Sequence, residues 1–458
     1  MRAIICGAGQ VGYGIAEHLA AEDNDITVID PAAELIQRIT DELDVRGVVG
    51  HGSHPDILEK AGAGDADMLI AVTFADEINM MACQVAHSLF ATPTKIARVR
   101  AQAYLDPAWQ TLFSRDHMPI DAIISPEVAV AKMAMRRLAL PGAFETIGFV
   151  DNRVIALGIT CEEACPVVNT PLKQLSELFP DLRAVVVGIV RDGRLFVPHG
   201  QDQMLTGDAV YVIAESSHAN RTLALFGHDE KTARRILIVG GGNIGFHLAQ
   251  MLEDQQPSTH VRIIEAHRNR AEHIAEQLKR AIVLNGSAVD LELLREAGAD
   301  ETEAFIAVSN DDRVNILSSV MARHEGASRA MCLINNPDFA SVLKPMGIDT
   351  YINPKAVTVS AILQYVRRGR IRAVYSIQNG AAEVMEAEAL QTSPLVGKPL
   401  REASVPEGVR IGALVRDDEV IIPRGHTEVR PHDTLVMFAL ADQVREVEHM
   451  FRVSLEYF

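Results

Sequence analysis

The chain has 458 residues, of which 48% are hydrophobic and 23% charged, and its 43 basic and 61 acidic residues give a formal net charge of −18. A chain of this length exceeds one hydrophobic core, so we expect several domains. The negative charge argues against nonspecific attraction to nucleic acid or anionic lipid. Five cysteines without regular spacing do not describe a disulfide framework. The longest apolar runs have only strand length, so we expect a soluble, cytoplasmic protein.

A glycine-rich fingerprint opens the first predicted domain, residues 1–141. Residues 4–12 read IICGAGQVG, in which an apolar strand runs into a glycine turn and then a helix. One glycine makes the turn, the second lets the backbone approach a pyrophosphate, and the third lets the helix pack on the sheet. The free N–H groups at the helix start then face the phosphates. The predicted cofactor contacts are Gly7, Gly9, Gln10, Val11 and Gly12.

The rest of this domain alternates short apolar strands with helical segments. We predict strands at residues 3–6, 26–29, 47–49, 68–72, 96–99 and 122–124, and a helix that starts at Pro126. Such alternation is typical of a parallel sheet covered on both faces. Asp30 ends the second strand, where a carboxylate accepts hydrogen bonds from ribose hydroxyls and repels a 2′-phosphate. This favours NAD(H) or another adenine nucleotide over NADP.

Residues 142–227 change character and become rich in strands and turns, which predicts a small α+β lobe. The charged stretch 228–235 is the expected link to the second half of the chain.

The second half repeats the first. Residues 237–245 read LIVGGGNIG, the strand HVRIIE ends at Glu265, residues 285–315 match 51–79, and residues 346–359 match 118–130. Residues 373–458 repeat the small lobe, for example IVRDGRLFVPHG at Ile189 and LVRDDEVIIPRG at Leu414. We therefore predict an α/β protein of order A-B-A′-B′, with two tandem Rossmann-like parallel-sheet lobes (1–141 and 232–372), each followed by a small C-terminal lobe (142–227 and 373–458). The second set of predicted contacts is Gly240, Gly242, Asn243, Ile244, Gly245 and Glu265.

In this order the chain resembles the family of tandem RCK (KTN) domains. The resemblance implies a non-enzymatic, NAD-binding regulatory subunit that gates a potassium-translocating integral membrane partner of the Trk type. It also implies a peripheral position on the inner face of the cell inner membrane. RCK lobes pair into rings of eight, so the resemblance implies a homotetramer. No metal and no nucleic acid are expected.

The resemblance also assigns further contacts. In the first site it implies the Gly52-Ser53 turn after the third strand and Thr73 after the fourth; in the second it implies Gly286, Ser287 and Ser309. The fifth strand of the first copy carries Arg98 and Arg100, where the second copy has Leu333 and Asn335. Guanidinium groups bind phosphate in a bidentate way. We therefore expect the first site to prefer the more highly charged nucleotide, such as ATP or ADP, and the two sites to differ.

Two acidic motifs have a structural and a functional interpretation. The segments from Thr73 to Asp76 and from Ser309 to Asp312 have the spacing of a helix capping box, which we favour over a cation site or a general acid/base pair.

Several other groups are open to two interpretations. Cys161 and Cys165 lack the second pair of a zinc motif, and we favour core cysteines. His51 and His54 flank the Gly52-Ser53 turn, and we favour a solvated loop pair over nucleotide contact. A run of arginines follows a helix end, where cations suit the helix dipole, and a docking surface is the alternative. These arginines are Arg367, Arg368, Arg370 and Arg372.

Three functions fit these features. A nucleotide-responsive regulator is favoured, because a dehydrogenase needs an acid/base group beside the nicotinamide. Neither a Tyr-x-x-x-Lys motif nor a histidine–carboxylate pair occurs at a plausible position in both copies. An NAD-dependent oxidoreductase with two sites is the alternative, and a structural protein with a fixed nucleotide is the third.

Overall fold

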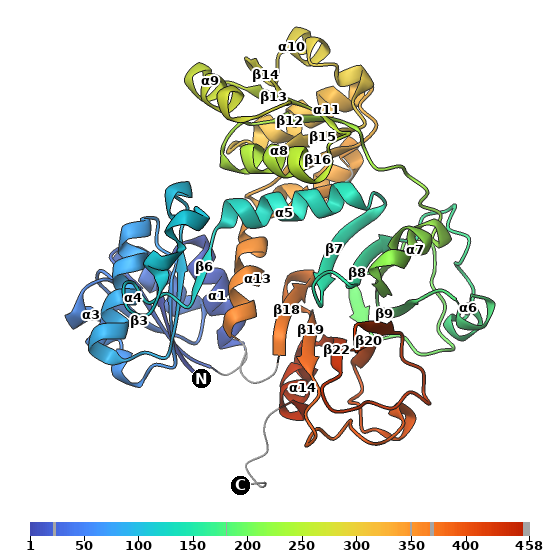
Figure 1. Ribbon diagram of the computed structural model, residues 1–458, viewed down its shortest axis with the longest axis horizontal. Coiled ribbons are helices and arrows are strands. Elements are labelled where there is room, and N and C mark those ends of the chain that lie inside the picture. Colours follow the sequence, from blue (N-terminus) through green and yellow to red (C-terminus); the bar gives the residue numbers. More distant parts are fainter. Residues whose placement is uncertain (22–23, 180, 349, 367–370, 452–458) are drawn as a thin grey trace. The chain divides into compact units, whose positions relative to one another are not determined.

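The computed structural model describes residues 1–21, 24–179, 181–348, 350–366 and 371–451 (Figure 1). The chain divides into two compact units. One unit is Met1–Val130 with Asn353–Val366, and the other is Ala131–Ile352 with Arg367–Phe458. None of the helices formed by the described residues has both the length and the apolar composition needed to span a bilayer.

The first unit contains a six-stranded parallel sheet of order β3-β2-β1-β4-β5-β6. Its strands are β1 (Arg2–Cys6), β2 (Asp25–Asp30), β3 (Arg46–Val49), β4 (Met68–Ala71), β5 (Thr94–Arg98) and β6 (Ala122–Ile124). Its helices are α1 (Gln10–Ala20), α2 (Ala33–Glu42), α3 (Pro55–Lys60), α4 (Asp76–Phe90) and the first part of α5 (Pro126–Ala139). The strand order reverses between β1 and β4, and ligands of such sheets bind where the carboxyl ends of these strands meet.

The second unit contains a sheet of the same order, β14-β13-β12-β15-β16-β17. Its strands are β12 (Arg235–Val239), β13 (His260–Glu265), β14 (Ile282–Asn285), β15 (Ala304–Ala307), β16 (Ala330–Leu333) and β17 (Thr350–Ile352). The accompanying helices are α8 (Asn243–Gln255), α9 (Arg268–Gln277), α10 (Leu291–Glu296), α11 (Asp312–Glu325) and α12 (Ala340–Leu343). The predicted strands therefore form in both copies, and the predicted first helical proline is confirmed at Pro126.

The helix that follows β17, α13 (Pro354–Val366), belongs to the first unit. It packs beside α1 (Figure 1), and its Ile362, Leu363 and Val366 share one buried core with Ile15 and Leu19 of α1. Helix α1 is therefore covered by a helix from the second half of the sequence.

Two small antiparallel sheets complete the second unit. The first has the order β10-β9-β11-β8-β7 and the second β18-β19-β22-β20-β21, so the duplication extends to both small lobes. The first set is β7 (Ala143–Phe149), β8 (Val154–Thr160), β9 (Ala184–Arg191), β10 (Arg194–Phe196) and β11 (Ala209–Glu215), with α6 (Leu172–Leu178) and α7 (Ala219–Leu225). The second is β18 (Ile371–Ile377), β19 (Ala382–Glu388), β20 (Val409–Arg416), β21 (Glu419–Ile421) and β22 (Thr434–Leu440), with α14 (Val444–Met450). The predicted α/β fold class is confirmed.

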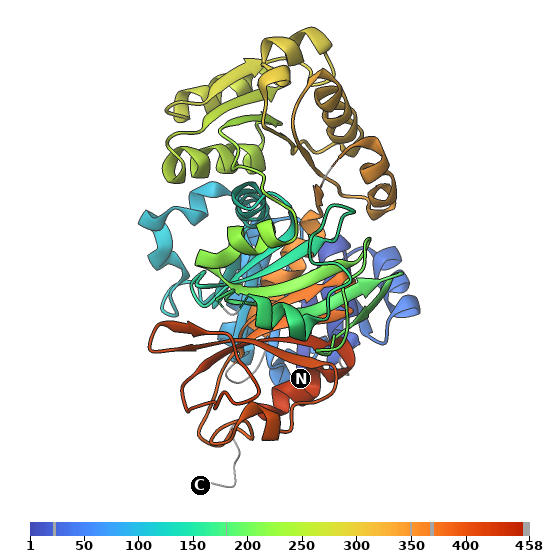
Figure 2. The same ribbon diagram turned by 90° about the vertical axis from the view of Figure 1, so that its right-hand side faces the viewer.

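The two small sheets share one core (Figure 2). Tyr211 of β11 and Phe438 of β22 are both fully buried, with ring centroids 6.3 Å apart. Gly412 lies so close to Ile213 that a Cβ there would come within 2.3 Å of the Ile213 side chain. The small lobes therefore bury apolar surface against each other.

Each small lobe also contains the same ion pair, between a half-buried arginine and a buried aspartate. Arg191 donates from Nε and Nη2 to both carboxylate oxygens of Asp208, over 2.9 and 2.6 Å. Arg416 and Asp433 repeat this fork, over 2.8 and 2.7 Å. Asp208 and Asp433 are each 2% exposed. Removing one partner of such a pair would leave an uncompensated buried charge.

Candidate functional site: two glycine-rich clefts

The glycine-rich loop after β1 closes on itself. Gly7 has a φ of +112°, in the region that favours glycine, and a Cβ there would lie 3.0 Å from the Thr73 nitrogen. A Cβ on Gly12 would lie 1.8 Å from the Gly7 carbonyl oxygen. These two glycines are therefore required by the protein's own packing.

Gly9 differs from both. Its φ of −67° and ψ of −174° are extended backbone values that any residue adopts, and no atom lies within 4 Å of the position of a Cβ. Gly9 also precedes the first turn of α1, whose N–H groups point out of the helix. The protein's own packing thus leaves open the space that a side chain at residue 9 would fill.

The second copy repeats this arrangement. Gly240 has a φ of +98°, and a Cβ on Gly245 would lie 1.9 Å from the Gly240 carbonyl oxygen. Gly242, with φ of −60° and ψ of −171°, has no atom within 4 Å of a Cβ. Both clefts therefore combine two structurally required glycines with a third whose side-chain space is empty.

The predicted carboxylates hold the glycine loops in place. Asp30 accepts the backbone N–H of Ala8 and of Ala32, both over 2.8 Å. Glu265 accepts the N–H of Gly241 over 2.7 Å and of His267 over 2.8 Å, and is 7% exposed. Each oxygen accepts one N–H and keeps acceptor capacity for a further donor. The ribose contact itself stays a prediction.

The turns after the third strand of each sheet have structural reasons for glycine. A Cβ on Gly52 would come within 2.7 Å of Cys6, and one on Gly286 within 2.6 Å of the Leu293 side chain. Ser287 accepts the Val289 N–H over 3.4 Å, and Ser53 is half-buried. The nucleotide contacts assigned to these turns are therefore not needed to explain their glycines.

Thr73 and Ser309 hydrogen-bond to an asparagine one turn into the next helix. Asn79 accepts the Thr73 N–H and hydroxyl over 2.8 and 2.7 Å, and donates to the Arg98 carbonyl over 2.9 Å. Asn315 makes the equivalent bonds to Ser309 and to the Leu333 carbonyl. These asparagines join the ends of the fourth and fifth strands, and sequence analysis did not single them out.

The capping-box prediction is wrong in both copies. Helix α4 has Ala75 as its N-cap residue, without a side-chain bond, and α11 is capped by Asp311. Asp76 instead accepts the N–H groups of Arg100 and Ala101, both over 2.8 Å. Asp312 accepts those of Asn335 and Asn336. The sequence spacing is that of a capping box, but the carboxylates of Asp76 and Asp312 bind backbone N–H groups of the segment that follows the fifth strand and not those at the start of their own helix.

The two arginines of the first copy lie at the carboxyl end of β5. The Arg100 Nε donates to Glu127 Oε1 over 2.9 Å, and its guanidinium lies 5.2 Å from the centroid of the Phe74 ring. The Arg98 Nε and the second oxygen of Glu127 are both buried without a hydrogen-bond partner in the described part of the chain. Burial, with Arg100 nearby, lowers the pKa of Arg98. Glu127 thus compensates the arginines and was missed because it lies 27 residues from Arg100 in sequence.

Among the described residues, the remaining candidates do not cluster into a site. His51 and His54 are exposed, with ring centroids 5.1 Å apart. All five cysteines are free and buried, and burial raises the pKa of Cys6 to about 12. Arg367, Arg368 and Arg370 lie outside the described residues. Within the described ranges, no three His, Cys, Asp or Glu side chains come together as metal ligands.

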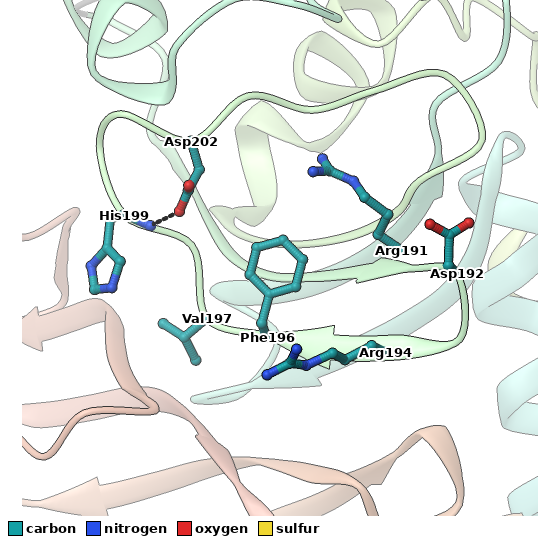
Figure 3. Close-up of a pocket in the computed structure, with 7 residues that line it drawn as sticks. All are labelled: Arg191, Asp192, Arg194, Phe196, Val197, His199 and Asp202. Atoms are coloured by element: carbon teal, nitrogen blue, oxygen red, sulfur yellow. Dashed lines mark hydrogen bonds between the residues drawn. The ribbon is translucent and has the colours of Figure 1, made fainter.

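A separate hollow of about 660 Å³ lies beside the β9–β10 hairpin of the first small lobe (Figure 3). Arg191 and Arg194 line it together with Asp192 and Asp202, so its charges are mixed. The Arg191 guanidinium is already paired with Asp208 and lies 5.7 Å from the Phe196 ring. The charge of Arg191 is therefore already compensated by Asp208.

The fold and the two clefts define a tandem Rossmann-type protein in which each Rossmann lobe is followed by a small β-rich lobe. The family comparisons agree: residues 3–126 and 236–354 match the TrkA-N domain, and residues 158–227 and 384–452 match the TrkA-C domain. The chain belongs to the TrkA family of Trk system potassium uptake proteins.

Relatives that match over their full length are named as TrkA proteins. The Trk system potassium uptake protein TrkA of Azorhizobium caulinodans is 55% identical over 458 residues, which are 100% of both chains. The TrkA of Halomonas elongata is 41% identical over 462 residues and is also covered completely.

Solved structures share the fold. The crystal structure of the GsuK RCK domain has a TM-score of 0.59 at 16% identity and covers 98% of this chain and 94% of that one. The GsuK channel bound to NAD has a TM-score of 0.60 at 16% identity, with 98% and 78% coverage. At these identities the similarity shows the fold alone.

Proposed function

We propose that this protein is a nucleotide-binding regulatory subunit of a potassium uptake system. Ligands in the glycine-rich clefts bias the conformation of an RCK ring, which gates a Trk-type membrane partner from the cytoplasmic face. Regulation of this kind requires a ligand that prefers one conformation, typically by about 1 to 3 kcal/mol of coupling. The proposal concerns binding and not turnover, and its oligomer is a homotetramer in which the eight RCK units, two from each chain, form one ring.

The observation that carries the proposal is the empty space at Gly9 and Gly242. Neither residue needs glycine for its backbone angles or its packing. Both stand where a dinucleotide fold brings the backbone against a pyrophosphate. A side chain there would obstruct a ligand and nothing else, so a ligand explains why both residues are glycine.

Three further observations support the proposal. The relatives that match over full length are named for potassium uptake, and a protein with the same fold is described as a channel bound to NAD. Helix α4 also exposes Met81 (48%) and Leu89 (62%). Apolar side chains of this size suit burial between copies of the chain.

The two sites take different ligands under this proposal. Arg100 of the first site pairs with Glu127, whereas the Arg98 Nε has no hydrogen-bond partner among the described residues. A polyphosphate would provide the oxygen atoms that the Arg98 Nε lacks. The first site therefore binds ATP or ADP in preference to NAD. The second site, with Leu333 and Asn335 at these positions, binds NAD(H).

The test is calorimetric titration of the nucleotide-free, full-length protein with NADH and with ATP, with NADH absorbance recorded afterwards. Gly9→Ala and Gly242→Ala should each remove one binding event. Gly64→Ala is the matched control, because a Cβ at residue 64 also meets nothing within 4 Å but lies outside both clefts. Saturable binding without loss of NADH supports a regulator, whereas steady NADH consumption with an added carbonyl substrate would establish the oxidoreductase alternative. Binding unaffected by either glycine variant would overturn the proposal.

A further inference from the structure

An arginine crosses the glycine-rich loop of the second cleft. Arg270 lies in the first turn of α9, five residues after Glu265. Its Nε donates to the Gly241 carbonyl over 2.8 Å, and its Nη2 lies 3.5 Å from the Asn243 side-chain oxygen. The guanidinium lies 5.5 Å from the centroid of the Phe246 ring. All three partners belong to the loop or to the first turn of α8.

The charge of Arg270 has no anionic partner among the residues that the structure describes. No carboxylate of the described chain lies within ion-pair distance of its guanidinium, although neighbouring Arg268 on the same helix pairs with Glu272 over 2.9 Å. The nearest backbone groups include the first turn of α8, where the helix dipole is positive. A cation placed beside a positive helix end is unfavourable until an anion binds between them.

The first cleft lacks this residue. Helices α2 and α9 both start three residues after their carboxylates, Asp30 and Glu265, so the position of Arg270 corresponds to Leu35. Leu35 packs against the apolar core of the first unit. The first cleft instead has two arginines at the carboxyl end of β5, whereas Arg270 of the second lies on α9.

We infer that Arg270 is the phosphate-binding, specificity-determining residue of the second cleft, and that its guanidinium contacts the pyrophosphate of a bound adenine dinucleotide. This inference rests on the proposed function. The loop contacts hold the guanidinium over Gly241 to Asn243, beside the open space at Gly242. Glu265, which accepts the backbone N–H of Gly241 while Arg270 donates to the Gly241 carbonyl, disfavours a 2′-phosphate as the group that Arg270 binds.

The experiment is titration of the full-length chain with NADH in a Gly9→Ala background, which leaves the second cleft as the binding site. Arg270→Leu introduces the residue of the first copy. Arg270→Lys keeps the positive charge but loses the paired N–H donors of the guanidinium. Arg268→Leu is the matched control, because Arg268 lies on the same helix turn with its side chain 80% exposed. Thermal unfolding of each variant shows that it is folded.

We expect Arg270→Leu to weaken NADH binding by at least about tenfold, the size of one charge-assisted hydrogen bond, and Arg270→Lys to fall in between. Arg268→Leu should stay within about twofold. Unchanged NADH binding in folded Arg270→Leu, with binding lost in Glu265→Ala, overturns the inference and leaves the proposed function standing. A preference for NADPH over NADH that disappears in Arg270→Leu also overturns it, because Arg270 would then read a 2′-phosphate. Absence of any NADH binding in the Gly9→Ala background contradicts the proposed function of the second cleft itself.

Discussion

Alanine substitutions at Gly9 and Gly12 should separate ligand binding from folding within one loop. In Gly12→Ala the new Cβ would lie 1.8 Å from the Gly7 carbonyl oxygen, whereas Cβ atoms do not approach such an atom closer than 3.0 Å. Loop and helix α1 must therefore move apart by about 1.2 Å, and overpacking of this kind costs about 1 to 3 kcal/mol. Because both partners are backbone, we expect the upper end, about 3 kcal/mol.

Gly9→Ala should behave differently. Its backbone angles suit alanine and the space is open. Alanine lowers the conformational entropy of the unfolded chain, which stabilises the folded protein, whereas the N-cap position favours glycine over alanine. The net change in the free energy of unfolding should therefore stay within about 1 kcal/mol. Nucleotide binding at the first cleft should nevertheless be lost, because the methyl group occupies the space beside the pyrophosphate.

Urea unfolding of the full-length chain, together with hydrogen exchange of residues 2–20, measures the stability of the loop, and calorimetry measures binding. The expected pattern is faster exchange of α1 in Gly12→Ala and wild-type exchange with lost binding in Gly9→Ala. Equal stability of Gly12→Ala and wild type would refute the closed-loop argument. Full binding by Gly9→Ala would refute the argument from empty space.

Three further predictions test other parts of the structure. Asp433→Asn should lower the free energy of unfolding by about 1.5 to 3 kcal/mol, because it removes the carboxylate that accepts the hydrogen bonds of half-buried Arg416, whereas the exposed control Glu272→Gln should change it by less than about 0.5 kcal/mol in urea titrations. Burial raises the pKa of Glu145, so its contribution to stability is present below the unfolded pKa and is lost as pH rises through the folded pKa. Glu145→Gln should thus raise the unfolding temperature more at about pH 8 than at about pH 4. An equal rise in unfolding temperature at the two pH values would contradict a raised pKa of Glu145 in the folded protein. Glu127→Gln should release Arg100 and tighten ATP binding several-fold in calorimetry, and weaker binding would show that Glu127 positions the arginine instead.

Sequence by itself determined the parts of this protein that follow local rules. The spacing of Gly7, Gly9 and Gly12 and the strand that ends at Asp30 predict a Rossmann-type turn. Only glycine adopts the positive φ of Gly7 and the close approach at Gly12. Alternation of short apolar strands with helices predicts the parallel sheets. Because the second half of the sequence repeats the first, both predictions apply to it as well. The two small lobes also have the same strand order.

The tertiary structure determined which side chains and backbone groups from distant segments contact each other. The spacing around Asp76 suits a helix cap, but the segment after β5 supplies nearer N–H groups. Helix α13 packs beside α1, although it follows β17 in the chain. Arg270 looks like any surface arginine of an amphipathic helix until α9 is placed next to the loop at Gly241. Local sequence specifies backbone conformation, whereas hydrogen bonds and ion pairs across 20 or more residues depend on how the sheets bring distant segments together, which no short pattern records.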